Sequence, residues 1–274
     1  MTSNGAGFTG SQDDSHGISL LNLVQNRTLD LRMAAIFWLL AERKASVIVA
    51  APPRLAGKST VLNAMLQMAP SRYQVVTARG VEEDFSFLGR TEPKSTYILV
   101  PEISDHLPMY LWGDKVRKVF EAMKEGYSLA ATMHSDSPED IAAQLASEEV
   151  GVTEDLLSGL HVVVNLYMGE RNMRPIRRVW KVSTVSRSNG NGNGATPISF
   201  WTVARWDSLR DALVYADGND VWNGLAKRLG MASNHMEEYT LSKQKVLDGW
   251  LDRGLTSVDQ MKGAVNSYYD RRKT

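Results

Sequence analysis

The chain has 274 residues, and its 31 basic and 31 acidic side chains give a formal net charge of zero. This length allows roughly one or two domains of ~100–200 residues, and the 43% apolar content excludes a chain that is disordered, collagen-like or coiled-coil throughout. The absence of cysteine excludes disulfides, thiolate metal sites and a cysteine nucleophile, while the balanced charge provides no bulk positive field for nucleic acid or an anionic membrane.

No segment has the pattern of an export signal or a membrane span. The longest apolar run, 33–41, is about half of the ~20 residues that a bilayer requires. Residues 1–17 are polar and lack the basic-then-apolar order of a signal peptide, so they are expected to form a disordered tail. We therefore expect a soluble, cytoplasmic protein.

Residues 18–167 alternate between helical and strand-like patterns after a first apolar stretch at 18–24. Apolar residues recur at helical spacing or in short β-branched runs. The predicted order is helix 29–43, strand 47–49, helix 59–68, strand 75–76, strand 97–100, helix 116–124, strand 129–133, helix 138–147 and strand 161–167. Apolar strands that alternate with helices predict an α/β fold, a parallel sheet covered on both faces.

The pattern changes after residue 168. Two β-branched and aromatic runs, 177–185 and 198–206, are joined by a stretch that includes 188–194, which contains only Ser, Asn and Gly. This arrangement predicts an antiparallel hairpin with a long flexible tip. From residue 220 to the end the pattern is helical.

The segment 47–60, VIVAAPPRLAGKST, reads as a buried strand, a loop and the start of an amphipathic helix. A phosphate requires backbone N–H donors, the positive end of a helix dipole and a mobile cation. In this interpretation Gly57 lets the backbone approach closely, Lys58 reaches the outer phosphates and Ser59 ligates magnesium. The predicted nucleotide-binding residues are Arg54, Leu55, Ala56, Gly57, Lys58, Ser59 and Thr60.

The first half of this loop departs from the full phosphate-loop pattern. Pro52 stands where the pattern has glycine, and both Pro52 and Pro53 lack a backbone N–H. A surface turn that contains Gly-Lys-Ser by chance is the alternative. The strand–loop–helix context favours nucleotide binding.

Two further polar side chains follow predicted strands. Glu102 ends the strand that begins near Tyr97, where a carboxylate orients water against a γ-phosphate or holds the magnesium shell. His134 follows the strand 129–133, where it can hydrogen-bond a γ-phosphate. Their alternatives are an exposed strand-end glutamate and a surface or capping histidine. Ser59 and Glu102 are the predicted magnesium-binding residues.

The order of these motifs resembles that of the ATPases that power type II and type IV secretion, pili and archaeal filaments, with most similarity to the archaeal-type and tight-adherence branches. The resemblance extends over 18–269 and rests on five segments: LLNLVQNRTLDLRMAAIFWLLAERKASVIVAAPPRLAGKSTVLNAML, YILVPEIS, AATMHSDSPEDIAAQL, HVVVNLYMGERNMRPIRRVWKVSTV and LAKRLGMASNHMEEYTLSKQKVLDGWLDRGLTSVDQMKGAVNSYYD. Glu102 takes the place of the modified Walker B glutamate, and His134 that of the family's box histidine.

The resemblance implies a RecA-like P-loop core at 18–206, including the late hairpin, and a C-terminal helical region at 207–274. It also implies ATP and Mg²⁺ as cofactors. The implied partners are further copies of the chain in a ring, or the membrane components of a secretion or filament system. No nucleic-acid partner is expected.

The resemblance also implies roles for further charged residues. In such rings a neighbouring subunit often supplies an arginine, and Arg54, Arg177 and Arg178 are the candidates. The family has an acidic box after its second strand, where the nearest acids here are Glu82 and Glu83. Glu83 is therefore a candidate catalytic residue beside Glu102 and His134.

Departures from the family pattern favour binding over turnover. The phosphate loop has lost glycines, Ser104 replaces an arginine, the arginine-bearing segment before the Walker B strand is shortened to 89–95, and only the tail precedes residue 18, so the family's N-terminal domain is expected to be missing. We expect weak or partner-dependent hydrolysis. The alternatives are a degenerate nucleotide-binding or scaffold subunit, and a nucleic-acid motor, which the zero net charge disfavours.

Overall fold

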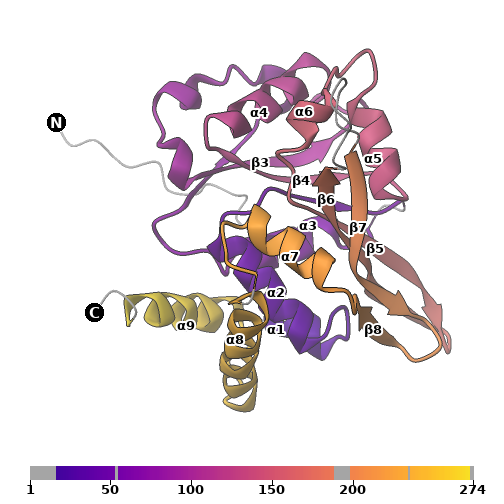
Figure 1. Cartoon of the computed structure of the whole chain (residues 1–274), viewed down its shortest axis with the longest axis vertical. Coiled ribbons are helices and arrows are strands. Elements are labelled where there is room, and N and C mark those ends of the chain that lie inside the picture. The colour runs from indigo at the N-terminus through magenta and orange to yellow at the C-terminus, as the bar shows by residue number, and fades with distance from the viewer. Residues whose placement is uncertain (1–16, 53–54, 188–197, 234, 272–274) are drawn as a thin grey trace.

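A computed structural model describes residues 17–52, 55–187, 198–233 and 235–271. Within these residues a single eight-stranded sheet has the order β2-β3-β4-β1-β5-β6-β7-β8 (Figure 1). The first five strands in this order are parallel, and β5 to β8 are antiparallel. The strands are β1 (Val47–Ala50), β2 (Gln74–Thr77), β3 (Thr96–Ile103), β4 (Ser128–Met133), β5 (Val162–Arg171), β6 (Arg174–Arg187), β7 (Ile198–Asp207) and β8 (Ala212–Tyr215).

Helices cover both faces of this sheet (Figure 1). They are α1 (Leu20–Gln25), α2 (Leu31–Glu42), α3 (Lys58–Leu66), α4 (Asp114–Lys124), α5 (Pro138–Leu145), α6 (Glu154–Leu157), α7 (Asn219–Arg228), α8 (His235–Asp252) and α9 (Val258–Asp270). The predicted α/β fold, a mostly parallel sheet followed by an antiparallel hairpin and C-terminal helices, is confirmed. No helix among the residues that the structure describes is long and apolar enough to cross a membrane.

Side chains of β1 alternate between two hydrophobic clusters, as the period of a strand requires. Val47 and Val49 lie in the cluster that contains α2 and α3, whereas Ile48 and Ala50 lie in the cluster that contains α4 and α5. All four residues are at most 1% exposed. The strand that leads into the predicted phosphate loop is therefore fixed on both sides by the core.

The C-terminal helices share the first of these clusters. Trp38 of α2 is fully buried and stacks on Trp250 of α8 with ring centroids 5.0 Å apart. Its indole N–H donates a 2.8 Å hydrogen bond to the hydroxyl of Tyr269 in α9. The buried Lys243 forms an ion pair with Glu42 at the end of α2. These contacts attach α8 and α9 to α2.

The antiparallel part of the sheet is larger than predicted. The hairpin of β6 and β7 is confirmed, but its predicted tip, 188–194, lies outside the described residues. β5 continues into a second hairpin with β6, which turns at Asn172 and Met173, both at positive φ. The region 207–274 was predicted to be helical, yet β8 lies within it and pairs with β7. Four residues are too few for a periodic pattern to identify a strand.

Hydrogen bonds between Ser46 and His161 join the start of β1 to the start of β5. The Ser46 amide donates a 3.1 Å hydrogen bond to His161 Nδ1, and the His161 amide donates to the Ser46 carbonyl. Burial, followed by the positive charge of Arg228, lowers the pKa of His161 to about 4.

Because the pKa of His161 is lower in the folded protein than its ordinary value of 6.5, the unfolded chain binds the proton first. We expect the free energy of unfolding to fall by at most about 3 kcal/mol between pH 6.5 and pH 4 on account of this residue. His161→Asn retains an acceptor for the Ser46 amide but does not titrate. Urea unfolding of both proteins across this range measures the difference, and parallel pH profiles would contradict it.

Candidate functional site

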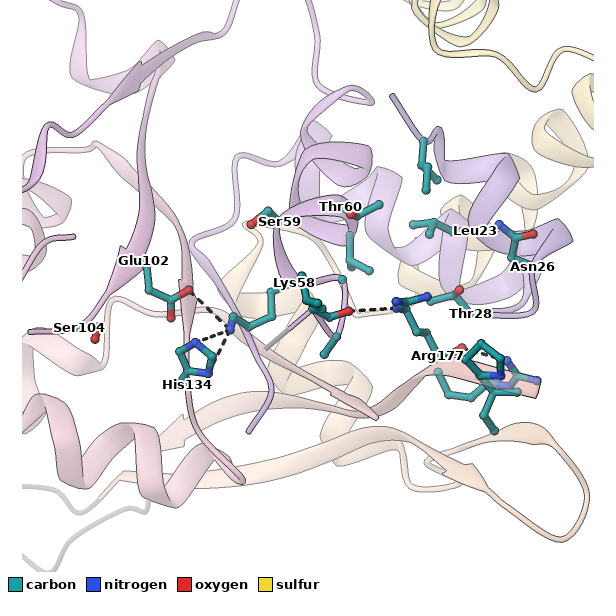
Figure 2. A pocket seen from close by; sticks show the side chains of 18 of the residues that line it. Leu23, Asn26, Thr28, Lys58, Ser59, Thr60, Glu102, Ser104, His134 and Arg177 are labelled. Carbon is teal, nitrogen blue, oxygen red and sulfur yellow. Dashed lines mark hydrogen bonds and ion pairs between the residues drawn. The ribbon is translucent and has the colours of Figure 1, made fainter. Parts of the chain in front are cut away.

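A cavity of about 880 Å³ lies at the C-terminal ends of β1, β3 and β4 (Figure 2). Its lining comes from four separated segments: 18–28, the loop 55–61 after β1, the end of β3 with the loop that follows it, and 174–178 of β6, together with His134 after β4. Among the described residues, the charged side chains in the lining are Lys58, Arg174, Arg177 and Arg178 against Glu102, and the charge of Arg178 is offset by Asp211 outside the lining. Such a cavity favours an anionic ligand.

The loop after β1 adopts the conformation that its glycine allows. Gly57 precedes α3 with φ +93°, in the left-handed region, and α3 begins at Lys58. Because Gly57 has no side chain to cap the helix, the first amides of α3 lack both intrahelical carbonyls and a capping group. These amides and the helix dipole make the start of α3 a suitable site for an anion. Arg54 and Pro53 lie outside the described residues.

The Lys58 ammonium lies between two other predicted site residues. Lys58 Nζ is 3.6 Å from Glu102 Oε2 and 3.3 and 3.2 Å from the Nδ1 and Nε2 atoms of His134. Figure 2 shows both side chains pointing toward this nitrogen. Lys58 is only 7% exposed, so the carboxylate stabilises a charge that has little access to water. The structure therefore brings together the three residues that the sequence placed on three different segments.

Glu102 has one oxygen engaged and one unengaged. Its Oε2 accepts a 2.7 Å hydrogen bond from the Thr132 hydroxyl on β4. Its Oε1 is buried and has no hydrogen-bond partner among the residues that the structure describes. A buried carboxylate oxygen without a donor is costly, and Glu102 lines the cavity. Because this oxygen is itself buried, the Glu102 side chain must move before a water molecule in the cavity can donate to it.

His134 is held by the turn between β4 and α5. Its Nδ1 lies 3.2 Å from the Pro52 carbonyl, so Nδ1–H as donor leaves Nε2 as the acceptor for Lys58. The Gln144 side chain donates to the His134 carbonyl. Ser137 caps α5 by accepting a hydrogen bond from the Asp140 amide at 3.0 Å. The imidazole is thus fixed at the cavity wall by contacts on both sides of it.

The residues that line the cavity could hold a magnesium ion only together with a bound phosphate ligand. Ser59 and Glu102, the predicted magnesium-binding residues, both line the cavity, and one carboxylate oxygen of Glu102 has no donor among the described residues. The structure shows no group of three or more His, Cys, Asp or Glu that would hold a metal in any described part of the chain. Magnesium usually retains several waters and binds through one or two protein groups plus substrate phosphates.

Glu83 does not join these residues. Its carboxylate accepts hydrogen bonds from the amides of Arg79 at 2.8 Å and Phe85 at 2.7 Å, and the residue is 5% exposed. Glu83 is not part of the cavity lining. The structure therefore does not support the predicted catalytic role, because this carboxylate is used to organise the loop after β2.

Several lining residues were not part of the predicted site. Asn26 and Thr28 follow α1, and Ser104, His106 and Tyr110 belong to the loop after β3. Ser104 and Asp105 both contact His106 Nδ1, at 2.7 and 2.8 Å. No spacing in the sequence identifies these positions, because they come together only when β3 and β6 take their places in the sheet.

Leu55 combines an unfavourable backbone conformation with high exposure. It has φ +63°, and its side chain is 83% exposed. For a residue with a Cβ atom the left-handed region costs about 1–2 kcal/mol. The loop after β1 therefore contains local strain that packing does not offset.

We expect Leu55→Gly to raise the free energy of unfolding by about 1 kcal/mol relative to Leu55→Ala, because only glycine removes the left-handed penalty. The alanine variant is the matched control, since it deletes the same exposed side chain but keeps Cβ. Urea midpoints at constant m-value provide the comparison. Equal stability of the two variants would show that the loop is not strained at this position.

Comparisons with known proteins yield distant similarities. No protein-family model matches the chain. An uncharacterized protein of Methanocaldococcus jannaschii is 22% identical over 237 residues, which cover 78% of this chain and 85% of that protein. The solved VirB11 ATPase of the Brucella suis type IV secretion system, in complex with sulphate, aligns with a TM-score of 0.40 and 17% identity over 66% of this chain.

The DotB ATPases of Yersinia pseudotuberculosis and Legionella pneumophila align with TM-scores of 0.38 and 0.39, at 15% and 14% identity, over 52% and 77% of this chain. This chain covers 66%, 44% and 55% of the VirB11 and two DotB chains, which is less than two thirds of each.

Proposed function

We propose that the chain binds ATP with Mg²⁺ in the cavity at the C-terminal ends of β1, β3 and β4. The observation that carries the proposal is the buried Lys58 ammonium at the start of α3, within 3.6 Å of Glu102 and within 3.3 Å of His134. The amides of Gly57 to Thr60 and the Lys58 ammonium would bind the phosphates, and the Ser59 hydroxyl would face the metal.

We further propose that the bound nucleotide is hydrolysed slowly. Bound magnesium would neutralise charge on the phosphates. After a movement of its side chain, the unpartnered Oε1 of Glu102 would accept a hydrogen bond from the attacking water, and Nε2 of His134 would contact the outer phosphate once Lys58 turns toward it. Slow turnover is expected because Ser104 stands where the family pattern has an arginine, so positive charge that would stabilise the transition state is missing.

The cellular role that best fits the sequence motifs is that of a motor subunit in a secretion or filament-assembly machine. This role would place the protein in the cytoplasm, in a ring of copies or in a complex with membrane components. Residues 18–206 would form the ATPase core and 207–274 a C-terminal region attached through α2. The order of motifs along the chain supports this proposal: predicted phosphate loop, strand-end glutamate, histidine box and arginine-bearing hairpin.

A scaffold subunit that has lost hydrolysis is the second candidate. The observation that favours it is that Lys58 already has Glu102 and His134 as neighbours, so the site is satisfied in part without a ligand. Pro52 also removes one backbone donor from the mouth of the loop. Binding and turnover must therefore be tested separately.

Binding of MgATP should be measurable as a gain in stability that depends on Lys58. At about 100 times its dissociation constant, MgATP should stabilise the folded protein by about 2.7 kcal/mol, and Lys58→Ala should abolish this gain because the phosphates lose their cation. Lys124→Ala, which removes an exposed lysine paired with Asp155, is the control and should retain the gain. Thermal unfolding with and without MgATP measures it. No stabilisation of the unaltered chain would favour the scaffold.

Hydrolysis should be slow and should depend on the Glu102 carboxylate. The purified chain should hydrolyse ATP at well under ~1 s⁻¹, the low end of ordinary enzyme rates. Glu102→Gln should lower that rate by about 10²-fold or more, because the amide cannot accept a proton, while ATP binding persists. Glu121→Gln on the exposed face of α4 is the control. Turnover at or above ~1 s⁻¹ by the isolated chain would contradict slow hydrolysis, and full activity of Glu102→Gln would contradict the proposed role of Glu102.

A further inference from the structure

Two adjacent arginines of β6 have different environments. Arg178 is 7% exposed, and its Nε and Nη2 atoms donate to the two carboxylate oxygens of Asp211 at 2.8 and 3.0 Å. This pairing lowers the pKa of Asp211 to about 2. Arg178 is therefore committed to a structural ion pair, even though part of it lines the cavity.

Arg177 points to the phosphate loop instead. Its Nε donates a 3.1 Å hydrogen bond to the Leu55 carbonyl, and Figure 2 shows this contact on the side of the loop opposite Glu102 and His134. Its Cδ would be 3.5 Å from a Cβ atom built on Gly57. The side chain thus lies along the loop and reaches the cavity.

The guanidinium of Arg177 has N–H groups that form no hydrogen bond with the described residues. A guanidinium carries five N–H groups, and the bond to Leu55 uses one of them. No hydrogen bond or ion pair engages its two Nη nitrogens anywhere in the described ranges of the chain. This planar group with a permanent charge suits phosphate oxygens, and among the described lining residues Glu102 is the sole acid that could compete for it.

Backbone contacts of β6 fix the position of Arg177 relative to the cavity. The amide of Val179 donates a 2.6 Å hydrogen bond to the carbonyl of Thr28, which joins β6 to the segment after α1. The pairing of β5 with β6 shifts register between Asn165 and Leu166, beside the same stretch. Because these contacts lie within one chain, Arg177 reaches the site of its own chain.

We propose that Arg177 is a second phosphate-binding residue of the nucleotide site, supplied by the β6 strand of the same chain rather than by a neighbouring subunit. This inference rests on the proposed binding of ATP. Lys58 would hold the phosphates from the helix side of the loop and Arg177 from the hairpin side, so the hairpin becomes part of the site.

The test uses inorganic tripolyphosphate and ATP, both with magnesium, as ligands of the full chain in equilibrium titrations. Arg177→Ala should weaken the binding of both ligands at least tenfold, because both present the phosphate chain. Arg177→Lys, which keeps the charge, should bind both ligands at least threefold more tightly than Arg177→Ala does. Arg210→Ala removes an exposed arginine outside the cavity and should bind both ligands as the unaltered chain does.

The outcomes separate the inference from the proposed function. If the unaltered chain binds ATP but Arg177→Ala binds both ligands within twofold of it, the inference is wrong while the proposed function stands. If Arg177→Lys binds no better than Arg177→Ala, the charge does not act on the phosphates and the inference is also wrong. If the unaltered chain binds neither ligand, both fail together. A circular dichroism melt of each variant establishes that it is folded.

Discussion

The site depends on how a buried ammonium group is stabilised. Lys58 is fixed by the start of α3 in a position with 7% exposure, where a charge without a partner is unfavourable. The Glu102 carboxylate at 3.6 Å supplies the opposite charge in the structure as it stands. A phosphate that enters the cavity offers the ammonium a better partner, because it also takes the amides at the start of α3. Under the proposed function, ligand binding would therefore release Glu102 through the movement of one side chain, that of Lys58.

This coupling links phosphate binding to catalysis under the proposed function. When Lys58 turns to the phosphates, Glu102 retains its hydrogen bond from Thr132 but loses its ion pair. The carboxylate is then held in place with both oxygens able to accept further donors, as the orientation of a water molecule requires. The hairpin would add a second positive group through Arg177, whose bond to Leu55 also supports the strained part of the loop.

Part of this site could be predicted from the sequence because it depends on local order. The switch from β-branched residues at 47–49 to helical periodicity after Gly57 locates the loop that precedes α3, which is the predicted phosphate loop. Glu102 and His134 were predicted to belong to the site, and they meet Lys58 because β3, β4 and β1 are neighbouring parallel strands whose C-terminal ends lie at one edge of the sheet.

Other features depend on contacts that sequence order does not reveal. Glu83 has the chemistry of a catalytic acid, but its carboxylate binds the amides of Arg79 and Phe85, which becomes apparent only from the path of the loop. The distinction between Arg177 and Arg178 arises from Asp211, which lies beyond β7.

The central claim is that Lys58 and the start of α3 bind a nucleoside triphosphate. Isothermal titration of the purified chain with ATP, in magnesium and again in EDTA, tests it most directly. The account predicts one site per chain, with ATP bound more tightly when magnesium is present. If the chain melts cooperatively but ATP and ATP analogues give no binding heat in either condition, the claim is contradicted.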